Sequence, residues 1–211
     1  YKKKMLQAKQ DYEKKKSKRL EKEIARCNNI QMARKIQLNS AYGAIGNQYF
    51  RYYKLANAEA ITLSGQVSIR WIENRMNRYL NKILKTENED YVIASDTDSI
   101  YLNLGPLVEV VYKDREKDGS GICTFLNKVC EVEFEKYIES SYETLAKYVN
   151  AYDNKMVMKR ENIADRGIWT AKKRYILNVW DSEGVRYEEP KLKMMGIEAV
   201  KSSTPAPCRT M

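Results

Sequence analysis

The sequence predicts an α+β fold: an antiparallel sheet with packed helices, plus a projecting helical hairpin. Two observations support this prediction. Long segments of helical composition or helical apolar spacing fill most of the first 85 residues, and strand-like segments joined by turn residues follow residue 155. A chain of 211 residues is long enough for one sizeable domain, or for a core domain with a helical appendage.

The N-terminal region predicts two basic helices joined by a short turn. Residues 2–27 contain no Pro or Gly and are rich in Lys, Glu, Gln, Leu and Ala, so they favour a helix. The asparagines of "CNN" at 27–29 favour a turn over a helix interior. A second helix is expected from Ile30 to Tyr42, ending at Gly43.

A third helix is predicted over residues 57–85, because its apolar side chains follow spacings of three and four and form one buried stripe. These are Ile69, Ile72, Met76, Leu80 and Ile83. A strand pair around Asp96, a loop over 106–121 and a fourth helix over 123–150 follow.

The last third of the chain predicts the sheet. Strand-like segments lie at 155–163, 168–180 and 185–197, and "DSEG" at 181–184 supplies a hairpin turn between the last two.

Charge is concentrated at the N-terminus. Residues 1–35 hold thirteen Lys and Arg but four Asp and Glu, so nearly all of the net charge of +10 lies there. A basic block of this kind suits a polyanionic partner, through release of counterions. A solvated, charged helix surface has the same composition, and the charge alone does not separate the two interpretations.

Composition also excludes several classes of function. The chain has no histidine, which removes Ser-His-Asp and Cys-His catalysis and argues against a zinc site. Its four cysteines form no C-x-x-C pair, as expected in a reduced intracellular compartment. No apolar run is long enough for a membrane span. The start has neither an initiator Met nor a signal peptide, so we expect an internal fragment or a processed chain.

The motif "KIQLNSAYG" at 35–43 places a cation, an amide and an aromatic ring on one helix face. Lys35, Asn39 and Tyr42 stand at i, i+4 and i+7, and Gly43 allows a close approach to the backbone. A phosphate-bearing ligand with a stacked base would use all four residues. An ordinary amphipathic helix capped by glycine gives the same pattern.

The motif "DTDSIY" at 96–101 follows the apolar run "YVIAS" and places two aspartates at a tight turn. Mg²⁺ prefers hard oxygen ligands and is commonly held by one or two carboxylates together with substrate phosphates. Asp96 and Asp98 are therefore candidate ligands for a two-metal phosphoryl displacement. A solvent-exposed turn would also keep both carboxylates in water.

The motif "KKRY" at 172–175 is expected inside a strand. Alternation would place Lys173 and Tyr175 on one face, and Lys172 and Arg174 on the other. Contact with phosphates from both sides of a ribbon explains three adjacent cations. A charged edge strand that discourages aggregation explains them too.

In this order, K-x3-N-S-x-Y-G, "DTDS" and "KKRY" resemble the family B DNA polymerases, and most closely those of T-even-like bacteriophages. The resemblance covers practically the whole chain. The sequence segments that flank these motifs also resemble the family: "GNQYFRYY" at 46–53, "NAEAIT" at 57–62, "RYILNVWDSEGVRYEEPKLKMMG" at 174–196 and "KSSTP" at 201–205. It implies three regions: fingers over 1–46, palm over 47–200, and the start of a palm-to-thumb connection over 201–211.

The resemblance also implies roles for individual residues. Asp96 and Asp98 match catalytic, metal-binding carboxylates, and Glu161 matches a palm carboxylate near the metals. The family's nucleotide-binding positions are matched by Lys35, Asn39, Tyr42 and Gly43. Its duplex-contacting positions are matched by Lys172, Lys173, Arg174 and Tyr175.

The implied activity is template-directed DNA synthesis by a two-metal mechanism with Mg²⁺, for which Mn²⁺ can substitute. The implied partners are primer–template DNA and deoxynucleoside triphosphates, in the cytoplasm of an infected bacterial host. The family's first palm motif, D-x-x-S-L-Y-P-S, and its exonuclease motifs are absent. We therefore expect negligible polymerisation by the isolated chain, and a second polypeptide or further segments that complete the site. The alternatives are a non-catalytic DNA-binding module or an inactive polymerase fragment. A stand-alone two-metal nuclease is a third hypothesis, against which the lack of further clustered acidic residues near "DTDS" argues.

Overall fold

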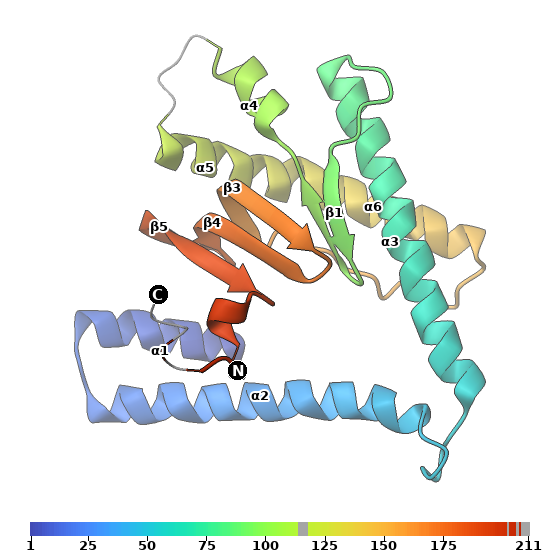
Figure 1. Cartoon of the computed structure of the whole chain (residues 1–211), viewed down its shortest axis with the longest axis vertical. Helices are drawn as coiled ribbons and strands as arrows, with labels where there is room; N and C mark the ends of the chain where they lie inside the picture. The colour runs from blue at the N-terminus through green and yellow to red at the C-terminus, as the bar shows by residue number, and fades with distance from the viewer. Residues whose placement is uncertain (114–117, 202, 206, 208–211) are drawn as a thin grey trace. The chain divides into compact units, whose positions relative to one another are not determined.

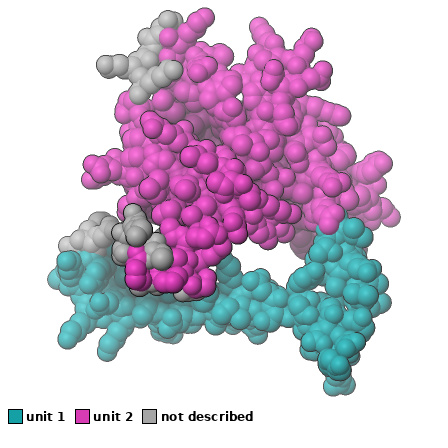
Figure 2. Space-filling view, viewed as in Figure 1, with its two compact units in different colours: residues 1–64 teal, residues 65–211 magenta. Residues whose placement is uncertain are grey.

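The computed structural model describes residues 1–113, 118–201, 203–205 and 207, and it has the predicted α+β fold. Part of the expected loop at 114–117 and most of the tail after Lys201 lie outside the described residues. The chain divides into two compact units, residues 1–64 and 65–211 (Figure 2), and each is described by itself.

Unit 1 contains the predicted helical hairpin, but its turn lies elsewhere. Helices α1 (Lys2–Lys14) and α2 (Lys18–Ile45) pack side by side (Figure 1), and the turn between them is at 15–17. Ser17 caps α2 by accepting a hydrogen bond from the Arg19 amide at 3.3 Å.

The predicted break at "CNN" was therefore wrong, because α2 runs through it. The Asn28 side chain accepts a hydrogen bond from the Gln31 side chain one turn on, and Cys27 is buried. The helix also continues past Gly43 and ends at Ile45, with Gly46 as its C-cap.

Helix α3 (Leu55–Leu84) runs from unit 1 into unit 2, where it supplies the main core. Ile72, Met76 and Leu80 from the predicted stripe are fully buried, whereas Ile83 is 44% exposed. Their partners are buried residues from later in the chain: Tyr91, Leu107, Phe134, Ile138, Tyr142 and Leu145. The helical period therefore positions α3 against the rest of unit 2.

A hairpin of β1 (Val92–Asp96) and β2 (Ser99–Leu102) follows α3. The next segment was predicted as a loop, but it begins with α4 (Gly105–Val111), which buries Leu107 in the core. The Pro at the start of α4 fits the first helical turn, where no backbone donor is needed.

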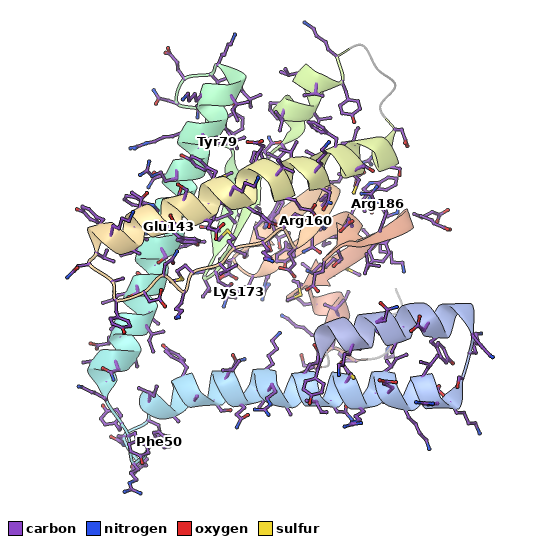
Figure 3. The ribbon with its side chains drawn as sticks, turned by 180° about the vertical axis from the view of Figure 1, so that it is seen from behind. Phe50, Tyr79, Glu143, Arg160, Lys173 and Arg186 are labelled. Atoms are coloured by element: carbon purple, nitrogen blue, oxygen red, sulfur yellow. The ribbon has the colours of Figure 1, made fainter. Side chains whose placement is uncertain are left out.

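The predicted fourth helix is one helical rod with an irregular middle. It consists of α5 (Gly119–Val129), a π-helical turn (Cys130–Phe134) and α6 (Glu135–Tyr148). The rod lies behind the strands in Figure 1 and in front of them in Figure 3. Helix α5 packs on β3 and β4, and α6 contributes to the main core.

The second sheet is antiparallel, with the order β3 (Asn162–Ala171), β4 (Arg174–Ser182) and β5 (Val185–Met195). The turn predicted at "DSEG" is confirmed: Glu183 and Gly184 connect β4 to β5 with positive φ angles of 53° and 88°. The segment expected as a strand over 155–163 pairs only from Asn162 onward, where β4 offers partners.

A buried ionic network joins this sheet to α5. Asp181 on β4 is 3% exposed and pairs with the guanidinium of Arg160. Arg160 also donates to the Asn127 side chain on α5, and Arg186 on β5 lies 3.9 Å from Asp181 Oδ2. Figure 3 labels both arginines. The network balances a buried carboxylate with cations from two other segments.

In the part of the chain that the structure describes, no helix combines the length and apolarity needed to cross a bilayer.

Candidate functional site

The two aspartates of "DTDS" lie at the tip of the β1–β2 hairpin, as predicted. Asp96 pairs with Ser99 as the last residue of β1, so Thr97 and Asp98 form the turn. Thr97 has a positive φ of 47°, which is uncommon for a β-branched residue, and its hydroxyl donates to Asp96 Oδ1 at 2.9 Å. Asp96 is half-buried and Asp98 is exposed.

The motif "KKRY" also forms a hairpin tip, so its predicted place inside a strand was wrong. Ala171 at the end of β3 pairs with Arg174 at the start of β4, and Lys172 and Lys173 form the turn between them. Lys173 has a positive φ of 61°. The predicted alternation of these side chains across a ribbon therefore does not hold, and the two lysines project from an exposed turn.

A pocket of about 270 Å³ brings the two turns together. Asp96 contributes to it from one hairpin, and Lys172, Lys173 and Tyr175 contribute from the other. One carboxylate and two ammonium groups from separate motifs thus line the same open pocket in unit 2. This arrangement suits a ligand that carries both bound cations and phosphates.

Three aromatic side chains connect the hairpins at this pocket. The Tyr101 ring lies edge-on to Trp169 and to Tyr175, with centroid distances of 5.3 and 5.5 Å. Burial raises the pKa of the Tyr101 phenol, and a hydrogen bond with Tyr175 raises it further, so Tyr101 stays neutral at physiological pH. The indole nitrogen of Trp169 is buried and has no hydrogen-bond partner among the described residues.

The carboxylates at the β1–β2 tip fit a hard divalent cation. Within the described residues, neither Asp96 nor Asp98 forms an ion pair with Lys or Arg, so their charge is available. Glu161 is instead paired with Lys193 at 3.3 Å. The described residues contain no cluster of three or more potential metal ligands, and the β1–β2 tip itself presents two carboxylates.

Unit 1 holds the other predicted site. Lys35, Asn39 and Tyr42 all lie on α2 and are exposed, and their spacing places them on one helix face. Gly43 lies inside the helix, and a Cβ added there would meet nothing within 4 Å. The face is therefore open to a ligand along its length.

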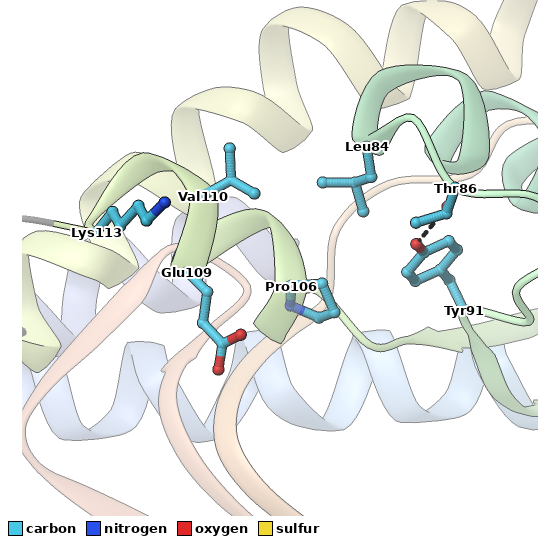
Figure 4. A pocket seen from close by; sticks show the side chains of 7 residues that line it. All are labelled: Leu84, Thr86, Tyr91, Pro106, Glu109, Val110 and Lys113. Atoms are coloured by element: carbon cyan, nitrogen blue, oxygen red, sulfur yellow. Dashed lines mark hydrogen bonds between the residues drawn. The ribbon is translucent and has the colours of Figure 1, made fainter.

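A second pocket, of about 500 Å³, contains none of the predicted site residues (Figure 4). It lies between the end of α3 and α4, where Thr86 and Tyr91 share a hydrogen bond of 2.8 Å. It is the larger of the two pockets, but the smaller one joins the two charged motifs and is the better candidate site.

Comparison with known proteins identifies the family. The model of DNA polymerase family B matches residues 2–206. The chain belongs to DNA polymerase family B. The match includes both hairpin tips and the exposed face of α2, so every residue of the candidate site lies in the family's region of similarity.

Two relatives within this polymerase family come from bacteriophages. A DNA-directed DNA polymerase of Escherichia phage RB69 is 45% identical over an alignment of 183 residues that covers 83% of this chain and 20% of that protein. A DNA-directed DNA polymerase of Enterobacteria phage T4 is 45% identical over an alignment of 193 residues that covers 88% of this chain and 22% of that protein. The chain thus spans about a fifth of the length of these curated relatives.

Sequence reasoning missed two residues of the pocket, Tyr101 and Trp169. Both stand in strands, where an aromatic residue is common and carries no functional signal. Their contact depends on side-chain packing between two hairpins that are far apart in the sequence, which no local pattern reveals.

Proposed function

We propose that this chain forms the fingers and palm part of a family B polymerase and serves template-directed DNA synthesis. The observation that supports this best is the pocket shared by Asp96 and the Lys172–Lys173 turn, in a chain of this family. In our proposal the fingers are residues 1–46, the palm is 47–200, and 201–211 begin the connection to a thumb. The site of action is the cytoplasm of the infected bacterium.

Asp96 and Asp98 hold the divalent cations of this reaction in our proposal, with Mg²⁺ as the ion used. Held by these two residues, the ions would supply charge neutralisation for the triphosphate and a lowered pKa for the attacking 3′ hydroxyl. Asp98 is exposed to solvent, and the Thr97 hydroxyl donates a hydrogen bond that orients the Asp96 carboxylate. Glu161 is a third candidate ligand, and it would first have to leave its pairing with Lys193.

The remaining site residues bind the substrates. On the open face of α2, Lys35 meets the phosphates of the deoxynucleoside triphosphate, and Asn39, Tyr42 and Gly43 lie beside the new base pair. The hairpin tip at 172–175 contacts the primer–template duplex, since Lys172, Lys173 and Arg174 are exposed cations.

Completion of this site requires segments that the chain does not contain. Two carboxylates at one turn are too few to hold two ions and orient a nucleophile. The chain also spans about a fifth of its relatives' length. We therefore propose that a second polypeptide or additional segments supply the missing aspartate of the first palm motif.

Primer extension tests this proposal. The chain is assayed alone with Mg²⁺ and deoxynucleotides, and then mixed with a family polypeptide that carries the first palm motif. Extension is expected in the mixture only. Asp98→Ala should abolish extension and leave duplex binding intact, whereas Asp153→Ala, an exposed aspartate paired with Lys155, should leave extension unchanged.

Extension by the chain alone would contradict the proposed incompleteness. A non-catalytic DNA-binding module is the alternative. It is favoured for the isolated polypeptide because the described residues contain no cluster of three or more potential metal ligands. In that case duplex binding would weaken steeply with salt and show no response to Mg²⁺ or nucleotide.

A further inference from the structure

The turn at Lys172–Lys173 rests on a glycine from another part of the chain. Gly196 directly follows β5 and has a positive φ of 65°. A Cβ added to Gly196 would overlap the carbonyl oxygen of Lys173 and would lie 3.2 Å from Arg174 Cγ. The backbone of Gly196 therefore occupies a position against Lys173 that no other residue can take without moving the turn.

A second contact lies two residues further on. Glu198 begins a short 3-10 helix (Glu198–Val200) and pairs with the guanidinium of Arg174 at 3.3 Å. Lys201 binds the same carboxylate oxygen at 3.0 Å, and the Thr204 hydroxyl donates to the Glu198 carbonyl at 2.6 Å. Arg174 is thus held on the side of the turn where Gly196 lies.

The turn itself lacks the residues that would set its shape. Lys172 and Lys173 are neither Gly, Asn nor Pro, yet Lys173 adopts a left-handed conformation. Such a conformation in a lysine is costly and persists only where surrounding structure imposes it. Gly196 supplies such a contact, because its backbone packs against Lys173 from outside the hairpin.

We propose that Gly196 and Glu198 are positioning residues that fix the Lys172–Lys173 turn and aim its cations at nucleic acid. We call the two residues the turn support. The inference rests on the proposed function, since it explains how the duplex-contacting cations obtain their geometry. Gly196 acts through the Lys173 backbone, and Glu198 acts through the Arg174 side chain. Neither is required to touch DNA.

The matched substitutions are Gly196→Ala and Gly184→Ala. Both glycines have positive φ and stand at the two ends of β5, but a Cβ added at Gly184 would meet nothing within 4 Å. Both variants therefore introduce backbone strain at a positive φ, and only Gly196→Ala also brings a Cβ against the lysine turn.

The first measurement is made without DNA, on the full chain. Amide hydrogen exchange over 172–174 and tryptic cleavage after Lys172 and Lys173 report the state of the turn. Gly196→Ala should accelerate both by about tenfold or more, while Gly184→Ala leaves them near the parent rate. Equal effects of the two variants would overturn the inference, whether or not the chain binds DNA.

The second measurement is duplex affinity in the parent chain and in a Lys172→Ala/Lys173→Ala background. Gly196→Ala should weaken binding by about tenfold in the parent and have little effect in the background, because the cations that it positions are already gone. A similar loss in both backgrounds would show a general structural defect and refute the positioning role.

Glu198→Ala provides a variant that keeps the Gly196 contact and remains informative if Gly196→Ala does not fold. It should loosen the Arg174 side chain, and so weaken duplex binding with a smaller effect on turn cleavage. Unchanged binding in Glu198→Ala would remove Glu198 from the turn support. Absence of duplex binding by the parent chain would count against the proposed function, while the exchange and cleavage results would still decide the role of Gly196.

Discussion

Replacement of Asp181 by Asn tests the buried ionic network between the sheet and α5. Asp181 is 3% exposed, and the Arg160 side chain that pairs with it is 9% exposed, so solvent screens this pair little. In Asp181→Asn, the side-chain amide oxygen could still accept from the Gly184 backbone, which bonds to Asp181 Oδ1 at 3.0 Å in the parent chain. The charge that balances Arg160 would be lost.

The expected loss of stability in Asp181→Asn follows from the burial of this ion pair. Removal of one partner from a buried pair leaves the other charge uncompensated and costs about 3–5 kcal/mol. Arg186 adds less, because it is partly exposed and lies 3.9 Å away. For a chain of this size, such a loss lowers the melting temperature by about 6–20 °C.

The assay is thermal unfolding followed by circular dichroism, with Asp165→Asn as the matched control. Asp165 lies on β3, pairs with Arg166 at 3.7 Å and has a side chain that is 39% exposed, so its loss should cost under about 1 kcal/mol. The double variant Arg160→Met/Asp181→Asn should recover part of the stability, because the buried Arg160 cation is removed together with its partner and only the partly exposed Arg186 loses an ion pair. Equal, small shifts in Asp181→Asn and Asp165→Asn would refute the reasoning.

Two further predictions concern the helical rod. Gly119→Ala places a Cβ 2.7 Å from the Trp180 ring and should lower the free energy of unfolding in urea by about 1–3 kcal/mol. The control Gly121→Ala, whose added Cβ has its nearest contact at 3.6 Å, should not lower it. Equal stabilities of the two variants would contradict this prediction. Burial raises the pKa of the Cys130 thiol from 9.0 to about 11, so the unfolded state loses this proton first as pH rises. The stabilisation from the neutral thiol is present below pH 9 and falls between pH 9 and 11. Over this window, the free energy of unfolding of Cys130→Ala should therefore depend on pH less steeply than that of the parent chain. Identical slopes of free energy against pH would exclude the effect.

The sequence predicted the features that local chemistry controls. The turn at Glu183–Gly184 contains a glycine where a positive φ is needed, and the stripe of α3 follows a simple helical period. Asp96 and Asp98 were correctly expected at a hairpin tip, because an apolar run, a polar pair and a second apolar run are typical of strand–turn–strand.

The errors occurred where distant contacts override local preference. The turn at Lys172–Lys173 contains no turn-forming residue, and its neighbour Gly196 lies on the far side of β5 in the sequence. The asparagines after Cys27 favour a break, yet α2 continues through them and the chain turns earlier, at Ser17. The assignment of individual roles to the site residues stays a prediction, because it comes from the family resemblance and not from the fold.

The π-helical turn at Cys130–Phe134 restricts insertions and deletions of residues between α5 and α6. The residues before it, Cys123 and Leu126, pack in a small cluster with Ile163, and residues after it pack in the main core. Each residue added to or removed from a helix rotates everything beyond it by about 100°. The π turn therefore sets the rotation between the apolar face of α5, which packs in the small cluster, and the apolar face of α6, which packs in the main core. Adding or removing one residue between Cys123 and α6 would turn one of these two faces out to water.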